Sequence, residues 1–477
     1  MKKITPIILF LIASWYTQGQ SFQSFIDHLN ALPVYERQAV ADSFLHAGHS
    51  FPYKENDTLV HFIYTADVTS VAVAGDATGW NPSLSLSRIS GTTFWYLSRY
   101  YEADARLDYK FVINGSNWIL DPRNPKTCTG GYGPNSELSM PAYVVPPEIA
   151  YYGNIAHGTI KDTAIYSSLL GNTRAIKVYL PPNYATSQVE YPAILFHDGL
   201  EYVTLGSTVN ILDYLIAHQL ITPVIAVFVP PVDRTAEYAG NKIDLFTGFI
   251  ITELMPVIDS KYRTSHDPSR RATLGASNGG NIALYLSMKH PESFGKVAAQ
   301  SSNVESVISN TFQNGPKLNL ELYLDIGKYD IPVLIPLVNN FVQILTATNY
   351  TFSHFHWNEG HSWGNWKGHL SLPLKQFFPL SLGLGEKKRS SGVYIESVYP
   401  NPFRDSTLIK FTVPPEASVK FVLYDSQGRP LETIYSGIIE SSIESVTFTN
   451  HGYPAGVYFI SLESGANKST KQINIIR

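Results

Sequence analysis

The stretch from Arg270 to Phe294 constrains the fold most, because it predicts a strand, a tight turn and a helix with a serine at the turn. An apolar run ending at Leu274 leads into Gly275–Gly280, which reads Gly-Ala-Ser-Asn-Gly-Gly. Apolar residues then recur at helical spacing from Ile282 to His290. In a Gly-x-Ser-x-Gly turn, small residues on either side let strand and helix approach closely while the strained backbone exposes the hydroxyl. We therefore predict that Ser277 is a nucleophile. The alternative is a glycine-rich turn that only joins the two elements.

Length and charge limit the remaining possibilities. A chain of 477 residues predicts two to four domains at about 150 residues each. Its formal net charge of −4 offers no basic surface, so we expect no nucleic-acid partner. The single cysteine, Cys128, cannot form a disulfide within the chain, so stability must come from apolar cores.

The first 20 residues predict an export signal. Lys2 and Lys3 precede the apolar run Ile4–Trp15, and a polar segment follows to residue 20. That arrangement is typical of a secretory signal peptide and is too short to span a bilayer. No other stretch is long and apolar enough, so we expect an exported protein without a membrane span.

Two patterns follow the signal. Residues 21–56 carry apolar residues at helical spacing and predict a helical leader. Between 57 and 145 the period changes to two, as at Val60, Phe62 and Tyr64, with glycine, asparagine and proline turns between the runs. This segment predicts a small antiparallel sandwich.

The rest of the chain predicts an α/β domain followed by a second all-β sandwich. Residues 146–382 alternate strand-like and helix-like runs, which is typical of a doubly wound, mostly parallel sheet of the α/β class. Residues 383–392 resemble a linker, and residues 393–477 again show period-two strands. We therefore predict an α/β domain flanked by two small all-β sandwiches.

A serine hydroxyl needs a base to accept its proton and an acid to orient that base. In doubly wound hydrolases the order along the chain is serine, acid, histidine. His361 stands in a loop between a strand and an aromatic-rich helix and is our predicted base, with His369 as the alternative. Asp330 follows a strand and is our predicted acid, although an aspartate so close to a proline also suits a helix cap. Asp325, at the end of the strand itself, is the competing acid.

The tetrahedral oxyanion needs two backbone donors. The residue after the nucleophile supplies one, which is the Asn278 amide. An earlier apolar strand breaks into the turn His197-Asp198-Gly199-Leu200, and we predict the Leu200 amide as the second. His197 and Asp198 precede the serine in chain order, so we expect them to shape this turn and not to form an acid–base pair.

The first sandwich resembles the early-set, immunoglobulin-like modules that precede glycogen-active enzymes and some esterases. The motifs that carry the resemblance are Val73–Asp76, Gly79-Trp80, Thr93–Leu97, Asp108–Phe111 and Leu120–Pro122. The resemblance implies a possible role in carbohydrate binding. Trp80, Trp95 and Trp118 would then stack on sugar rings, or alternatively pack in the core.

The last 85 or so residues resemble the C-terminal sorting domain of the bacterial type IX secretion system. Three landmark motifs stand in the usual order, at Val398–Phe403, Leu423–Arg429 and Ala455–Ile460. The resemblance implies an address recognised by that secretion machinery, and hence a secreted or cell-surface protein. A terminal sandwich that binds the substrate or the main domain is the alternative.

The α/β segment resembles the esterase D family, which includes feruloyl, acetylxylan and enterochelin esterases. The motifs are Tyr179–Pro182, His197–Gly199, Arg234 with Glu237-Tyr238, the serine turn, Gly327–Asp330, and Gly360–Trp363 with Trp366. On these positions the family implies Ser277 as nucleophile, His361 as base and Asp330 as acid. Asn278 departs from the family, where related sequences often have methionine.

We therefore expect a secreted carboxylic-ester hydrolase that works through an acyl-enzyme without a metal or organic cofactor. Its expected substrates are feruloyl or acetyl esters of plant polysaccharide. A siderophore esterase is the alternative within the same chemistry. A serine peptidase and a non-catalytic polysaccharide-binding protein with a degenerate hydrolase domain are the alternatives outside it.

Overall fold

The computed structural model describes residues 21–380 and 393–476, except 415, 427, 440–442 and 466. The predicted signal peptide and linker lie outside the described residues. The chain divides into two compact units. One contains the residues up to Val144 together with Asn358–Gly360, and the other contains Val145–Trp357 and the residues from His361 onward.

The predicted helical leader forms two helices, α1 (Phe22–Ala31) and α2 (Val34–Leu45). Pro33 separates them, because a proline cannot donate the backbone hydrogen bond that would continue a helix. Phe22, Phe25 and Phe44 share a buried cluster with Phe94 of the following sandwich. The leader therefore belongs to the hydrophobic core of the first unit.

The sandwich that follows the leader has two sheets of antiparallel strands. The first has the order β1 (Tyr53–Lys54), β2 (Leu59–Thr65), β6 (Phe94–Tyr100), β5 (Ser87–Arg88). The second is built around β7 (Arg106–Ile113), with β3 (Val71–Gly75), β4 (Leu84–Ser85), β8 (Asn117–Ile119), β9 (Thr127–Gly130) and β10 (Gly133–Ser139). Alternation of apolar residues therefore predicted both layers.

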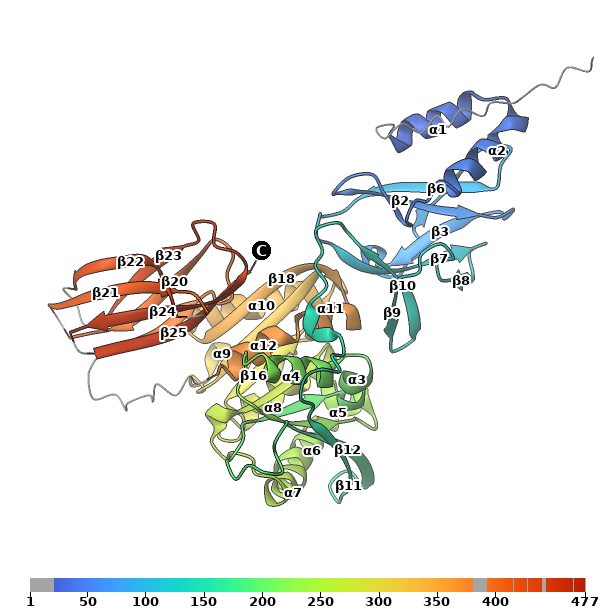
Figure 1. Cartoon of the computed structure of the whole chain (residues 1–477). Helices are drawn as coiled ribbons and strands as arrows, with labels where there is room; N and C mark the ends of the chain where they lie inside the picture. Colours follow the sequence, from blue (N-terminus) through green and yellow to red (C-terminus); the bar gives the residue numbers. More distant parts are fainter. Residues whose placement is uncertain are drawn as a thin grey trace, which may run out of the picture. The chain divides into compact units, whose positions relative to one another are not determined.

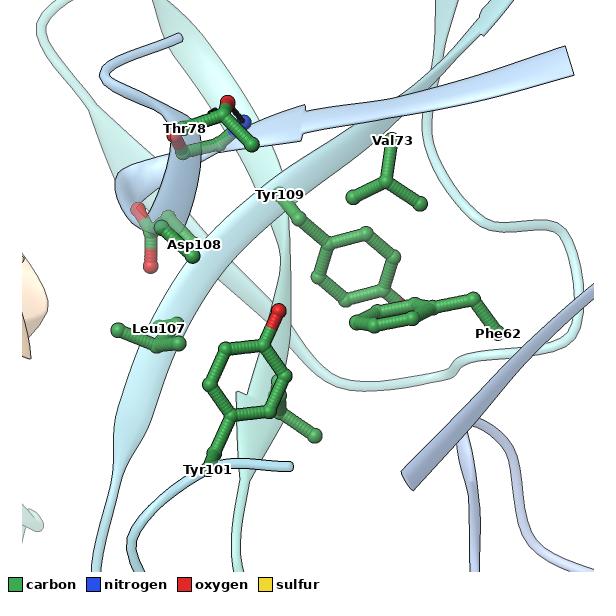
Figure 2. A pocket seen from close by; sticks show the side chains of 10 residues that line it. Phe62, Val73, Thr78, Tyr101, Leu107, Asp108 and Tyr109 are labelled. Atoms are coloured by element: carbon green, nitrogen blue, oxygen red, sulfur yellow. Dashed lines mark hydrogen bonds between the residues drawn. The ribbon is translucent and has the colours of Figure 1, made fainter. Parts of the chain in front are cut away.

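A pocket opens between the two sheets, and Figure 2 shows the side chains that line it. Phe62 and Tyr109 supply aromatic walls. None of the three tryptophans considered for sugar stacking lines this pocket. Trp95 is only 6% exposed, which agrees with the alternative that its ring packs in the core. Trp118 is exposed, whereas the Trp80 indole donates a hydrogen bond to Asp76.

The second unit contains the α/β domain. Its strands have the order β11 (Thr159–Ser167), β12 (Asn172–Leu180), β14 (Ile225–Val229), β13 (Ala193–His197), β15 (Arg271–Ala276), β16 (Lys296–Gln300), β17 (Glu321–Tyr329), β18 (Thr351–Gly360). Pairs from β14 through β17 are parallel, and β11 and β12 are antiparallel. Parallel strands align their carboxyl ends at one edge of the sheet, which is where ligands bind in such folds.

Helices cover both faces of this sheet (Figure 1). They are α3 (Gly199–Thr204), α4 (Thr208–Ala217), α5 (Arg234–Ala239), α6 (Ile243–Gly248), α7 (Met255–Lys261), α8 (Asn278–Lys289), α9 (Ser306–Asn314), α10 (Leu334–Ala347), α11 (Trp363–His369) and α12 (Ser371–Phe377). One apolar cluster joins the sheet to α8 and α10, and another joins it to α4 and α12. The prediction of a doubly wound α/β-hydrolase sheet is thereby confirmed.

The helical stretch from Ile243 to Lys261 is not regular throughout. A π-helical segment at Phe249–Leu254 separates α6 from α7. Pro256 lies in the first turn of α7 and lacks the amide that a continuous helix requires.

The C-terminal region forms a second sandwich, drawn in orange to red in Figure 1. One sheet has the order β19 (Tyr394–Tyr399), β20 (Ser406–Thr412), β23 (Ile443–Thr449), and the other has the order β22 (Pro430–Ile439), β21 (Ala417–Tyr424), β24 (Gly456–Ser464), β25 (Asn467–Ile475). The buried rings of Phe411 and Phe421 meet edge to face, with centroids 4.8 Å apart. The predicted sandwich thus has its own core.

Candidate active site

Ser277 occupies a strained turn directly after β15. Its backbone has φ 58° and ψ −125°, a region that non-glycine residues rarely adopt and that costs about 1–3 kcal/mol. The Ser277 amide donates to the carbonyl of Gln300 at 2.8 Å, which fixes the turn against the end of β16. The predicted strand, turn and helix are therefore present, with the serine at the turn.

Glycines flank Ser277 because β15 and α8 nearly touch. A Cβ on Gly275 would lie 2.2 Å from the carbonyl oxygen of Gly279, and one on Gly280 would lie 2.9 Å from the Ser302 Cβ. Neither contact is sterically possible, so the spacing in the motif follows from backbone packing.

The predicted base and acid are paired. His361 Nδ1 lies 2.7 Å from Asp330 Oδ1, and the Asp330 side chain is fully buried. The same carboxylate oxygen accepts from the Ile331 amide at 2.7 Å. The N-cap of α10 is Val333, so Asp330 does not cap that helix. A carboxylate at this distance from Nδ1 holds the ring with Nε2 available as the acceptor of a proton.

The competing acid, Asp325, lies elsewhere. It is fully buried on β17, where it accepts hydrogen bonds from the Tyr323 hydroxyl at 3.1 Å and the Gln300 amide at 3.4 Å. Burial raises the pKa of Asp325 to about 6. The alternative base, His369, stacks on Trp357 with ring centroids 3.8 Å apart. Neither residue hydrogen-bonds to His361 in the described part of the chain.

Within the described residues, no hydrogen bond connects Ser277 to His361. Within residues 21–380 and the described part of 393–476, Ser277 Oγ makes no hydrogen bond. Ser277 and Asp330 each follow a parallel strand, β15 and β17, so both lie at the carboxyl edge of the sheet. Catalytic hydrogen bonds are often long before substrate binds.

Trp366 and Gln300 connect the serine turn to the histidine, and no sequence pattern predicted this network. The Gln300 side-chain amide donates to the Trp366 backbone carbonyl at 3.0 Å. The Gln300 backbone carbonyl accepts from the Ser277 amide. The Trp366 ring meets the His361 ring edge to face, with centroids 5.0 Å apart. The Trp366 indole in turn donates to Ser301 Oγ at 3.1 Å. Trp366 of α11 therefore packs against the His361 ring.

The predicted oxyanion donors lie at two turns of the same sheet edge. Asn278 begins α8 and Leu200 lies in the first turn of α3. Neither amide hydrogen-bonds to another group within the described residues, so both remain available to a ligand. Gly199 lets α3 approach β14, since a Cβ there would lie 2.2 Å from the Val229 amide nitrogen.

His197 and Asp198 shape the turn before Leu200, as predicted. His197 is fully buried, hydrogen-bonds through Nε2 to Thr273 Oγ1 at 2.8 Å, and has its pKa lowered to about 3 by burial. A fully enclosed histidine whose protonated form is this disfavoured is a poor base. Asp198 is paired with Arg234 at 2.8 Å. Burial by itself lowers the pKa of Arg234, but the hydrogen bonds and the charge of Asp198 raise it by more. The pKa of Arg234 is therefore raised.

The pairing of Asp198 with Arg234 was not predicted from the sequence. The available signal was that each residue follows an apolar run, β13 or β14, which places both at the carboxyl edge of one parallel sheet.

Two segments of the chain match known families. Residues 167–376 match the family described as "Putative esterase", and residues 397–476 match the "Secretion system C-terminal sorting domain". The first segment therefore forms an esterase-family domain and the second a type IX sorting domain, which indicates export. The resemblances predicted for both segments are confirmed. None of the described helices is long and apolar enough to cross a membrane.

Individual proteins are also similar to parts of the chain. An uncharacterized protein, YjcH of Bacillus subtilis, is 27% identical over 237 residues, which are 46% of this chain and 98% of that protein. The endo-1,4-beta-xylanase/feruloyl esterase of Xylanibacter ruminicola is 31% identical over 160 residues, which are 31% of this chain and 22% of that enzyme.

A solved structure shares the fold. The enterobactin esterase of Shigella flexneri, determined in the presence of 2,3-dihydroxy-N-benzoyl-serine, superimposes with a TM-score of 0.58 and 22% identity. The match covers 70% of this chain and 98% of that one.

Proposed function

We propose that the protein is an exported serine esterase that hydrolyses carboxylic esters through an acyl-enzyme. The observation that carries the proposal is the His361–Asp330 pair, 2.7 Å apart, at the sheet edge where Ser277 stands on a strained turn. The esterase-family domain over residues 167–376 supports the same chemistry.

Each residue has a defined role in the proposed mechanism. Ser277 Oγ attacks the ester carbonyl carbon while His361 Nε2 takes its proton, and Asp330 stabilises the resulting imidazolium. The amides of Leu200 and Asn278 donate to the tetrahedral oxyanion. When the intermediate collapses, the proton on His361 passes to the departing alcohol. Water then attacks the acyl-enzyme while His361 accepts its proton. When this second intermediate collapses, His361 returns the proton to Ser277 Oγ, and the carboxylic acid is released.

We propose feruloyl or acetyl esters of plant polysaccharide as the substrates. The relative from Xylanibacter ruminicola, whose name joins xylanase and feruloyl esterase, supports this class. The sorting domain supports it too, because export brings the enzyme to polymers that do not enter a cell. The first sandwich remains a candidate carbohydrate-binding module through the exposed Trp118.

A substrate panel tests this proposal. Purified protein is assayed on methyl ferulate, acetylated xylan, a catecholate siderophore ester and a peptide substrate, alongside Ser277→Ala and the control Ser306→Ala. Ser306 is an exposed serine of α9. We expect ester hydrolysis that falls by about 10⁴-fold or more in Ser277→Ala and is unchanged in Ser306→Ala.

Each other result of the panel has a defined meaning. Cleavage of the siderophore ester alone would keep the mechanism and replace the substrate class. Peptide cleavage without ester cleavage would indicate a peptidase. Full activity in Ser277→Ala would overturn the mechanism, and inactivity of the natural sequence on every ester would favour a binding protein.

A further inference from the structure

We propose that the ion pair between Arg234 and Asp198 is a positioning device that keeps the two oxyanion donors in register. The inference rests on the proposed function, because it concerns the amides of Leu200 and Asn278. In this role Arg234 does not touch the substrate. It acts by holding two strained turns at a fixed separation.

The contacts of Arg234 reach both turns at once. Its Nε donates to Asp198 Oδ1 and its Nη2 to Asp198 Oδ2, each at 2.8 Å. The same Nη2 lies 3.3 Å from the carbonyl oxygen of Ala276 and donates to it. One rigid guanidinium therefore bridges the loop after β13 and the end of β15. Its planar fork makes the geometry directional, which a lysine ammonium would not reproduce.

The bridged residues stand next to the proposed donors in the chain. Asp198 precedes Gly199-Leu200, and Ala276 precedes Ser277-Asn278. Asp198 and Ser277 both have positive φ, 54° and 58°. Such conformations persist only where the surroundings impose them. A movement of either turn would shift one amide relative to the other, and about 1 Å of misplacement is enough to cost a large factor in rate.

The Asp198 carboxylate is also enclosed by the serine turn. A Cβ on Gly279, in the first turn of α8, would lie 2.8 Å from Asp198 Oδ2. The Asp198 amide donates to the Tyr238 hydroxyl at 2.9 Å, and the guanidinium carbon of Arg234 lies 5.6 Å from the centre of the Tyr238 ring. The carboxylate thus touches α8 on one side and Arg234 on the other. Its side chain is only 7% exposed.

Positioning is a better interpretation than substrate binding for this arginine. The Arg234 side chain is 40% exposed, but Nε and Nη2 are both committed to Asp198, and the adjacent carboxylate balances the positive charge. A residue that binds substrate would alter KM when replaced. A residue that aligns oxyanion donors would alter kcat, because those donors bind most strongly in the transition state.

The experiment measures kcat, KM and inhibitor affinity in Arg234→Gln, Arg234→Lys, Asp198→Asn and the Arg234→Gln/Asp198→Asn double variant. We expect kcat to fall by about 10²-fold in Arg234→Gln, with KM within about threefold, which is the scale of losing one oxyanion donor. The kcat of the double variant should be no lower than that of the slower single variant, because both substitutions remove the same ion pair. A trifluoromethyl ketone, whose adduct with serine carries an oxyanion, should lose affinity in proportion to kcat/KM. The carboxylic acid product should bind unchanged.

Arg271→Gln is the matched control. Arg271 begins β15, at the opposite end of the strand from Ser277, and pairs with Asp259 at 2.7 Å. Its side chain is 6% exposed, so this ion pair is more buried than the one that Arg234 makes. We expect this variant to lower the melting temperature and keep kcat. If Arg234→Gln does not fold, Arg234→Lys carries the test, with a smaller loss in kcat and the same unchanged KM.

Several outcomes would overturn the inference. These are an unchanged kcat in the folded variants, a rise in KM alone, or loss of trifluoromethyl ketone affinity that does not follow kcat/KM. Ser277→Ala, measured in parallel, separates this failure from failure of the proposed function. If that variant keeps full activity, the nucleophile itself is wrong and the oxyanion role falls with it.

Discussion

Two aspartates near the end of β17 have different surroundings, and this difference separates their roles at the scale of single residues. Asp330 lies in the loop beyond the strand and accepts from His361 at 2.7 Å. Asp325 lies within the strand, enclosed with Tyr323 and Gln300. The sequence left both open as the acid, because a sequence pattern does not specify which side chain of a strand end reaches a neighbouring loop.

Replacement of Asp330 should act on catalysis. In Asp330→Asn the side chain can no longer stabilise a protonated His361, and the amide can present a donor to Nδ1 that favours the wrong tautomer. We expect kcat to fall by about 10⁴-fold while KM changes little. Asp325→Asn, measured beside it, should keep most of the kcat. A greater loss in Asp325→Asn than in Asp330→Asn would contradict this assignment.

At the scale of elements, β15 to β17 and α11 share a buried polar network. Asp325 of β17 accepts from Gln300 of β16, and Gln300 donates to the Trp366 carbonyl of α11. Trp366 then contacts the His361 ring. The network therefore sets the position of α11 against the sheet, and its central carboxyl group carries a pKa raised by burial to about 6.

That raised pKa predicts a loss of stability as the pH rises. Between about pH 4 and pH 6 the unfolded chain has released the Asp325 proton while the folded protein still holds it, because the ordinary value is 3.8 and the folded value about 6. The unfolded state then binds fewer protons, so the free energy of unfolding declines with rising pH across this window, by roughly 3 kcal/mol in total. Above pH 6 this contribution no longer changes.

Denaturant unfolding from pH 3.5 to 8 checks this expectation. Compared with the natural sequence, Asp325→Asn should show a flatter dependence of unfolding free energy on pH between 4 and 6, and an unchanged dependence above 7. Parallel curves for the two proteins across the whole range would show that Asp325 does not titrate as described.

The elements themselves were largely predictable, and the exceptions have physical causes. Period-two runs predicted both sandwiches, and strand–helix alternation predicted the parallel sheet, because burial on one face or both imposes those patterns. The Gly275-x-Ser277-x-Gly279 spacing predicted the serine turn, and the close approach of Gly275 to Gly279 supplies the steric reason. The bridge from Arg234 to Asp198 and the network through Gln300 escaped prediction, since they join loops that are distant in sequence and depend on side-chain directions.

At the scale of the whole molecule, the chain combines an esterase-family domain with a sorting domain that has its own core. The residues proposed for catalysis all precede residue 380. Among the described residues, the two apolar clusters of the α/β domain end at Phe378. The sorting sandwich has a separate cluster that begins at Val393. The residues proposed for catalysis and the sorting domain therefore lie in different segments of the chain.

Removal of the sorting domain should separate export from catalysis. A chain ending at residue 380 should keep the kcat/KM of the full chain on a short aryl ester, since no proposed catalytic contact involves the later residues. Expressed in a bacterium with type IX machinery, it should remain cell-associated while the full chain reaches the surface or the medium. Normal export of the shortened chain, or loss of its activity despite a folded state, would contradict this separation.

The nucleophile is the central claim, and covalent labelling tests it most directly. The protein is treated with a fluorophosphonate, and the modified peptide is identified by mass spectrometry while residual ester hydrolysis is followed in the same sample. We predict a single adduct on Ser277 whose extent equals the lost activity, and no adduct in Ser277→Ala. Complete inactivation with the adduct on another residue, or full labelling of Ser277 with hydrolysis intact, would contradict the account.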